Sequence, residues 1–279
     1  MRPGPHAKCL PKMPNPPSAL AETVTRTLRD LIEGPADDRK LQTALRLLAK
    51  WRSQMIDATV ERKSGSKVLF GPFKGMDYGV RAAEGARAAR LIGVYEASLA
   101  PVIEEIVRRA YPLVIDVGAA EGYYAVGLAR RMPGARVLAR DESEAAQALC
   151  GELARRNGVE DRVEIGGRIG HADLDICAAQ PTLVLCDIEG AEDDLLDPEK
   201  APGLRAADLL VEVHEAMKPG LTARLVDRFR PTHRITALGR HVDDRGLPAW
   251  MEGLSDLDRL LALWEWRSGP TPWLWMERR

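Results

Sequence analysis

The chain has 279 residues, of which 45% are hydrophobic and 29% charged, a composition that suits a globular protein with one large core and extra helical material. The 40 Lys and Arg residues almost balance the 41 Asp and Glu residues, so no overall electric field attracts nucleic acid or an anionic membrane. No C-x-x-C pair, membrane-spanning run or secretion signal stands out, which predicts a cytoplasmic protein with reduced cysteines.

The amino-terminal segments are predicted to be a tail and two helices. Residues 1–17 are rich in proline and basic side chains and are expected to form a disordered tail. A helix capped by Ser18 and a longer one from Asp38 show apolar residues at helical spacing. Together they form a helical extension over residues 18–65. This extension either packs on the core, the simpler interpretation, or mediates a homodimer.

The next segment, residues 66–110, is predicted to contain a hairpin and helices. Apolar and polar residues alternate from Lys67 to Tyr78, which indicates a hairpin or two short strands. The Ala-rich and Arg-rich stretch from 81 to 91 is expected to be helical, and Pro101 opens another helix that ends near Arg109.

The central feature of the chain is Pro112 to Tyr124, which reads PLVIDVGAAEGYY. A short apolar run ends in Asp116, and Gly118 and Gly122 then flank a turn that leads into a predicted helix over 123–131. A strand, a glycine-bearing turn and a helix amino terminus together indicate a nucleotide-cofactor site. A dinucleotide is disfavoured because the turn lacks the spacing G-x-G-x-x-G.

Strands and helices alternate over the rest of the chain, which is typical of a doubly wound α/β sheet. The predicted strands cover 136–139, 162–165, 183–186, 208–213, 235–238 and 273–276, with helices at 145–154, 221–229 and 257–263. Trp273 and Trp275 alternate on the last strand and are expected to pack in the core.

Two motifs carry a family resemblance. The sequence DVGAAEGYY resembles the S-adenosylmethionine loop of class I methyltransferases, and is most similar to the FkbM-type family, which commonly has D-V-G-A-N-x-G-Y-Y; this chain departs at Ala120 and Glu121. The run D-I-E-G-A-E, from Asp187 to Glu192, matches the segment after the fourth strand in that family. The likeness covers about Tyr95 to His214.

The resemblance implies a Rossmann-like class I methyltransferase fold with an N-terminal helical extension. Its seven-stranded sheet is mostly parallel and has an antiparallel last strand. It also implies S-adenosyl-L-methionine as the cofactor, bound by a domain at residues 111–279 and covered by residues 66–110.

Several residues are candidates for holding the cofactor. The first loop contributes Asp116, Gly118, Ala119 and Gly122. Asp141 follows the second strand at about the 20-residue spacing where an acid meets the ribose in related folds, and a carboxylate can accept both ribose hydroxyls. Its alternative role is to cap the next helix.

The resemblance also implies contacts outside the loop. Asp173 stands where class I methyltransferases place an acid against the adenine amino group. Tyr95 and Glu96 belong to a G-x-Y-E segment that often lies over the cofactor in similar enzymes. An equally supported alternative is a buried tyrosine followed by a helix-capping glutamate.

Catalytic candidates follow from the sheet, because the carboxyl ends of parallel strands face one crevice. His214 is the first choice for a base that accepts a proton from a hydroxyl, and Asp187 is the second. Asp187 could instead cap the short helix that contains Glu192. Carboxylates around His214 raise the possibility of Mg²⁺, but no second D-D or D-N pair completes a familiar site, so no metal is predicted.

The predicted activity is transfer of a methyl group from S-adenosylmethionine to a hydroxyl of a small molecule or sugar by direct displacement. The expected partner is a small-molecule acceptor, with no nucleic acid and no membrane. Two alternatives stay open: a non-catalytic protein that binds the cofactor, and an aminopropyl-type transferase on the same fold.

Overall fold

The computed structural model describes residues 18–83, 85–267, 269 and 271–279, and separates into two units, residues 1–54 and 55–279. The predicted tail over 1–17 lies outside the described residues. In the first unit, α1 (Ala19–Ile32) begins where the Ser18 hydroxyl accepts a hydrogen bond from the Ala21 N–H, as its sequence predicts. The long helix α2 (Asp38–Ser64) begins in this unit and ends in the second.

The second unit is built on a seven-stranded sheet of order β3-β2-β1-β4-β5-β7-β6. Its strands are β1 (Leu113–Val117), β2 (Arg136–Arg140), β3 (Val163–Gly166), β4 (Thr182–Cys186), β5 (Asp208–Glu212), β6 (His233–Leu238) and β7 (Trp273–Arg278). Strands β1 to β5 pair in parallel, whereas β7 is antiparallel to both of its neighbours. This strand order confirms the class I methyltransferase fold.

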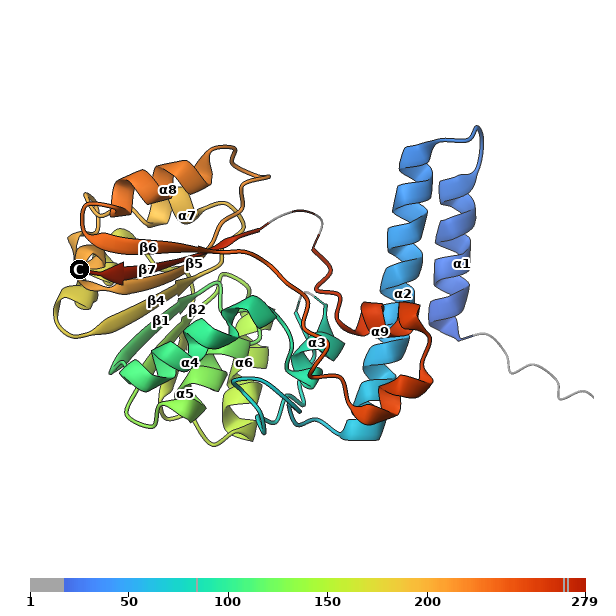
Figure 1. The fold of residues 1–279 in the computed structure, drawn as a ribbon, viewed down its shortest axis with the longest axis horizontal. Coiled ribbons are helices and arrows are strands. Elements are labelled where there is room, and N and C mark those ends of the chain that lie inside the picture. The colour runs from blue at the N-terminus through green and yellow to red at the C-terminus, as the bar shows by residue number, and fades with distance from the viewer. Residues whose placement is uncertain (1–17, 84, 268, 270) are drawn as a thin grey trace, which may run out of the picture. The chain divides into compact units, whose positions relative to one another are not determined.

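Helices cover both faces of this sheet (Figure 1). One face carries α4 (Ala100–Arg109), α5 (Tyr123–Arg131) and α6 (Glu144–Arg156), and the other carries α7 (Glu192–Leu195) and α8 (Leu221–Phe229). The helices α3 (Arg87–Ile92) and α9 (Asp256–Ala262) also belong to this unit but cover neither face of the sheet (Figure 1). Coverage on both faces explains why the central strands are continuous apolar runs.

The core follows the apolar strands. Every residue of β1, β4 and β5 is buried. Side chains such as Ile115, Val184 and Leu209 are fully enclosed and pack into one cluster with Phe229 from α8. Trp273 and Trp275 are also buried, as their alternation on the last strand predicts. The rigid centre of the sheet holds the loops at its carboxyl ends in place.

The segment before β1 differs from its prediction. The hairpin is a tight loop with one bridge, Lys67 to Asp77, rather than two strands. The helix expected over 81–91 begins only at Arg87, because Gly85 and Ala86 have φ angles of 94° and 53° that a right-handed helix excludes. The Asp57 carboxylate accepts a hydrogen bond from the Ala88 N–H at 2.7 Å and stabilises this late start.

In the described part of the chain, no helix has both the length and the apolar character needed to cross a bilayer.

The central strand yields a stability prediction. Replacing the fully buried Ile115 by alanine removes packed methyl groups and leaves a cavity, so the free energy of unfolding should fall by about 2–5 kcal/mol. The exposed Leu260→Ala, on α9, should change it by less than about 0.5 kcal/mol. Urea denaturation followed by tryptophan fluorescence measures both. Equal losses in the two variants would contradict this description of the core.

Candidate functional site

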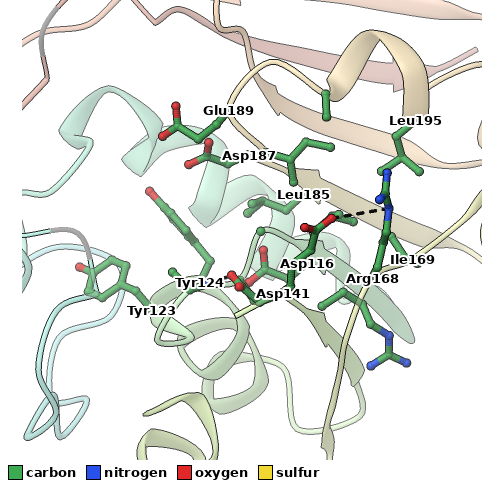
Figure 2. A pocket seen from close by; sticks show the side chains of 18 of the residues that line it. Asp116, Tyr123, Tyr124, Asp141, Arg168, Ile169, Leu185, Asp187, Glu189 and Leu195 are labelled. Carbon is green, nitrogen blue, oxygen red and sulfur yellow. Dashed lines mark hydrogen bonds and ion pairs between the residues drawn. The ribbon is translucent and has the colours of Figure 1, made fainter. Parts of the chain in front are cut away.

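A cavity of about 610 Å³ opens at the carboxyl ends of β1, β2 and β4 (Figure 2). Its lining includes Asp116 and the loop to Glu121, Asp141 and Ile169 after β2 and β3, and Tyr95 and Asp187. Such a size lies within the range of cofactor pockets in proteins. Its position is the one at which open α/β sheets bind their ligands.

Asp116 is the most unusual group in this cavity. Its side chain is 1% exposed, and neither carboxylate oxygen forms a well-directed hydrogen bond, although the Ala125 N–H lies close enough to lower its pKa in part. Burial, together with the neighbouring charge of Asp187, raises the pKa of Asp116 to about 7. A buried carboxylate without donors is costly, so the position suits a ligand that brings N–H donors and positive charge.

Gly118 brings the loop after β1 against the loop after β4. The Asp187 N–H donates to the Val117 carbonyl at 2.9 Å, which extends the pairing of the two strands. Gly118 has a φ angle of 81°, and a Cβ there would lie 1.7 Å from the Asp187 carbonyl oxygen. Only glycine fits this approach. Ala119 follows and lines the cavity, as the sequence predicts for a loop of small residues.

Asp141 is held by backbone donors. One carboxylate oxygen accepts from the Ala120 N–H at 2.9 Å, and the other accepts from the Ser143 N–H at 2.8 Å. Ala120 adopts a φ angle of 46° to make this bond. Each oxygen of Asp141 keeps a lone pair for a further donor. Both predicted roles, cofactor contact and local capping, are therefore compatible in one side chain.

Glu121 is a residue whose role the sequence did not indicate. It is fully buried and accepts from the Tyr78 hydroxyl at 2.5 Å and from the Ala83 N–H at 3.0 Å. Its other close neighbour is Arg90, whose Nε lies 3.1 Å away. In the sequence, the only sign of this role is that a charged residue stands inside a turn of small residues. In the structure, Glu121 anchors the segment before β1 to the loop after β1.

Three predicted cofactor residues, Gly122, Asp173 and Glu96, lie outside the cavity lining. Gly122 instead packs against α6, since a Cβ at this position would lie 2.6 Å from the Sγ atom of Cys150 in that helix. Asp173 caps its own turn by accepting from the Gly170 N–H at 2.8 Å. Gly170 and His171 line the cavity near this turn, and Asp173 does not. The loop after β3 therefore shapes the pocket through other residues than the one expected.

Aromatic residues supported by a buried ion network form another part of the cavity wall. Tyr95 and Tyr124 line it, together with Trp273. Glu96 lies behind them and does not line it: its carboxylate accepts from the Tyr124 hydroxyl and pairs with Arg267. The predicted G-x-Y-E contact is thus divided, with Tyr95 at the cavity and Glu96 supporting its wall.

The two predicted catalytic residues differ in their access to the cavity. Asp187 lines it, whereas His214 is buried beneath it. The His214 Nδ1 lies 2.7 Å from Glu192, and its Nε2 lies 3.4 Å from Glu189 and 3.6 Å from Asp187. Burial lowers the pKa of His214, but these three carboxylates outweigh it and raise the pKa above its usual value. An imidazole that is enclosed by three carboxylates and does not line the cavity is poorly placed to act as a base.

Glu192 explains the second motif. It is fully buried, and its carboxylate accepts from the N–H groups of Ile188 and Gly190 at 3.2 Å each. The same oxygen meets His214 Nδ1. The motif D-I-E-G-A-E is therefore a loop folded around its last glutamate, and this folding presents Asp187 at the end of β4.

One group of ligand-type atoms lies beside this loop. Asp187, Glu212 and His214 each offer an atom within 4.8 Å of the others, a spacing that could hold a metal ion. The Arg267 guanidinium, however, already contacts Glu212 and supplies positive charge there. The surroundings of these residues therefore resemble an ion-pair network more than an open metal site.

Comparisons with known proteins point to methyltransferases. No protein-family model matches the chain. It is 38% identical over 104 residues to the release factor glutamine methyltransferase of Chlorobaculum tepidum, covering 37% of this chain and 32% of that protein. It is 35% identical over 71 residues to the human MTRF1L release factor glutamine methyltransferase, covering 23% of this chain and 21% of that protein. The chain thus matches about a third or less of these relatives.

Solved structures of low sequence identity superpose over most of the chain. A putative O-methyltransferase from Klebsiella pneumoniae is 12% identical with a TM-score of 0.44, covering 92% of this chain and 96% of that one. An O-methyltransferase from Bacillus cereus in complex with SAH is 12% identical with a TM-score of 0.43, covering 92% and 97%. Because these scores are low, the fold assignment rests on the strand order.

These findings confirm one prediction and correct another. The chain has the class I methyltransferase fold, and S-adenosylmethionine is the cofactor that agrees with the fold, the pocket and the matched methyltransferases. The predicted small-molecule acceptor is wrong, because both relatives are named for methylating a glutamine of a release factor, which is a protein.

The contact at Gly118 yields a prediction. In Gly118→Ala the new Cβ overlaps the Asp187 carbonyl, and the left-handed backbone alone costs roughly 1–2 kcal/mol. The free energy of unfolding should fall by at least that amount, and both loops should shift. Gly134→Ala is the matched control, since nothing lies within 4 Å of a Cβ there. Urea denaturation of the two variants gives the comparison; similar midpoints would rule out the close approach.

Asp116 yields a pH-dependent prediction. Because its folded pKa is about 7 and its ordinary value is 3.8, the folded state binds the proton more tightly and the cost of this charge grows as pH rises from about 4 to about 7. Asp116→Asn removes the charge. The melting temperature of Asp116→Asn minus that of the unsubstituted protein should therefore be larger at pH 8 than at pH 5, without cofactor. Thermal scans at both pH values test this, and a difference independent of pH would contradict it.

Proposed function

We propose that this protein is an S-adenosylmethionine-dependent methyltransferase that modifies a side chain of a protein. The assignment of the cofactor rests on one observation: two carboxylates in different environments, Asp116 and Asp141, line the same cavity. Asp116 is buried without donors, and Asp141 is braced by backbone N–H groups with lone pairs to spare. The names of the two relatives support the protein acceptor.

The residues present fit this cofactor. The methionyl ammonium of S-adenosylmethionine brings the N–H donors and positive charge that the buried oxygens of Asp116 lack. The ribose hydroxyls match the free acceptor positions of Asp141. The end of the cavity beside Ile169 and His171 then receives the adenine, and the end beside Tyr95 and Asp187 faces the acceptor.

The chemistry requires mainly alignment. When bound, S-adenosylmethionine supplies an electrophilic methyl group on a cationic sulfur. The aromatic wall of Tyr95, Tyr124 and Trp273 excludes water from this end and orients the acceptor. Asp187 is the lining carboxylate best placed to accept a hydrogen bond from the acceptor group and then its proton. His214, held by Glu192, orients Asp187 and balances its charge.

The departures in the loop support an intact site rather than an empty scaffold. Ala120 still turns its N–H toward Asp141, and Glu121 fastens the loop to Tyr78 and Arg90. The resemblance to the FkbM-type family remains a prediction that rests on the two sequence motifs. We assign residues 66–110 the role of a cover and residues 111–279 that of the cofactor-binding domain.

Cofactor binding gives the first test. Asp141→Ala should weaken binding of S-adenosylhomocysteine by at least about tenfold, because hydrogen bonds to a charged group contribute about 1.5–3 kcal/mol each. Glu160→Ala, which removes an exposed carboxylate in the turn after α6, should leave the affinity unchanged. Isothermal titration calorimetry measures both. Absence of binding to the folded, unsubstituted protein would refute the proposal.

The acceptor is tested separately. Purified release factor is incubated with the protein and S-adenosylmethionine carrying a tritiated methyl group, and peptide mass spectrometry then locates any added methyl. Label on a glutamine side chain supports the proposed acceptor class, and Asp187→Asn should slow the transfer. If the cofactor binds but no protein in this assay is labelled, the acceptor assignment fails while the cofactor assignment stands.

A further inference from the structure

Arg90 is a buried cation that lines the cavity and is paired with Glu121. It lies on α3, is 4% exposed and lines the pocket beside Tyr95. Its guanidinium carbon lies 3.9 Å from the centre of the Tyr95 ring, which fixes the plane of the group. Its Nη1 donates to the Gly85 carbonyl. An arginine held so firmly is already oriented before any ligand arrives.

The charge of Arg90 is only partly matched by protein groups. Glu121 lies 3.1 Å from its Nε, but that atom forms no well-directed hydrogen bond. Glu121 also accepts from the Tyr78 hydroxyl and the Ala83 N–H, so several donors share its charge. Within the described residues, the guanidinium forms a hydrogen bond from Nη1 to the Gly85 carbonyl, and the buried Nε has no hydrogen-bond partner. The guanidinium therefore keeps donors for a ligand anion.

The other arginines of the lining are engaged elsewhere. Arg140 pairs with Glu164 at 2.7 Å, and the exposed Arg168 lies 3.5 Å from Glu142. Both belong to the β2 and β3 side of the cavity, with Asp141. Among the described arginines of the lining, Arg90 is thus the buried one that stacks on Tyr95.

The carboxylates of Asp116 and Asp187 line the same cavity as Arg90 and lie near each other. A ligand carboxylate placed there without a cation would be repelled by both of them. An ammonium alone would be attracted. A pocket that offers Asp116 to an ammonium and Arg90 to a carboxylate matches both charges of an α-amino acid group.

We infer that Arg90 binds the carboxylate of the methionyl group and so determines the choice of cofactor. This inference rests on the proposed function. It means that Arg90 makes the protein select S-adenosylmethionine over decarboxylated S-adenosylmethionine, which is the donor in aminopropyl transfer. A bidentate guanidinium–carboxylate pair is strong and directional. Decarboxylated S-adenosylmethionine, the donor in the aminopropyl alternative, lacks the carboxylate that Arg90 would bind.

The test compares three ligands by calorimetry. S-adenosylhomocysteine has the ammonium and the carboxylate, its decarboxylated analogue has only the ammonium, and 5′-methylthioadenosine has neither. The unsubstituted protein should bind S-adenosylhomocysteine about 10- to 100-fold more tightly than the decarboxylated analogue. In Arg90→Gln this preference should disappear, while the affinity for 5′-methylthioadenosine stays within about twofold.

The outcomes separate this inference from the proposed function. If Arg90→Gln weakens all three ligands equally, the residue has a structural role only and the inference is overturned. If it changes none of them, the inference also fails, although the cofactor assignment holds. If the unsubstituted protein binds none of the three, the proposed function itself fails. Should Arg90→Gln not fold because Glu121 is left unpaired, the double variant with Glu121→Gln removes both charges, and the same loss of preference is expected.

Discussion

The close approach of two backbones holds the site together. Gly118 lies against the Asp187 carbonyl, and the Asp187 N–H bonds to Val117, so the loops after β1 and β4 form one unit. This contact depends on the parallel pairing of β1 with β4, which aligns their carboxyl ends. Because of it, Asp116 and Asp187 face one cavity, and the charge of Asp187 contributes to the raised pKa of Asp116.

The site places several charges in a nearly dry environment, and each is stabilised differently. Glu121 is matched by a hydroxyl, an N–H and a guanidinium, and Glu192 by two N–H groups and an imidazole. Asp116 has no such partners. The second oxygen of Glu192 is also without a partner, but Glu192 does not line the cavity, so a ligand in the cavity can supply donors to Asp116 and not to Glu192. Cofactor binding should therefore also stabilise the protein.

Site residues could be predicted from the sequence where their role depends only on standing at the carboxyl end of a strand. Asp116, Asp141 and Asp187 follow strands whose apolar runs are plain in the sequence, and all three line the cavity. Residues whose role depends on side-chain direction were harder to place. Asp173 turns back onto its own loop, and His214 lies under the cavity among carboxylates. Local spacing does not specify these orientations, because packing from other elements decides them.

By itself, the sequence determined the alternation of strands and helices, the class of fold and the cofactor loop, since apolar periodicity and glycine positions act over a few neighbouring residues. Only the tertiary structure decided which charges meet. Arg90 and Glu121 are separated by a helix and a strand in the chain, yet their side chains lie in contact beside the cavity. Such pairs form because burial forces each charge to find a partner across elements, and that partner has no fixed distance in sequence.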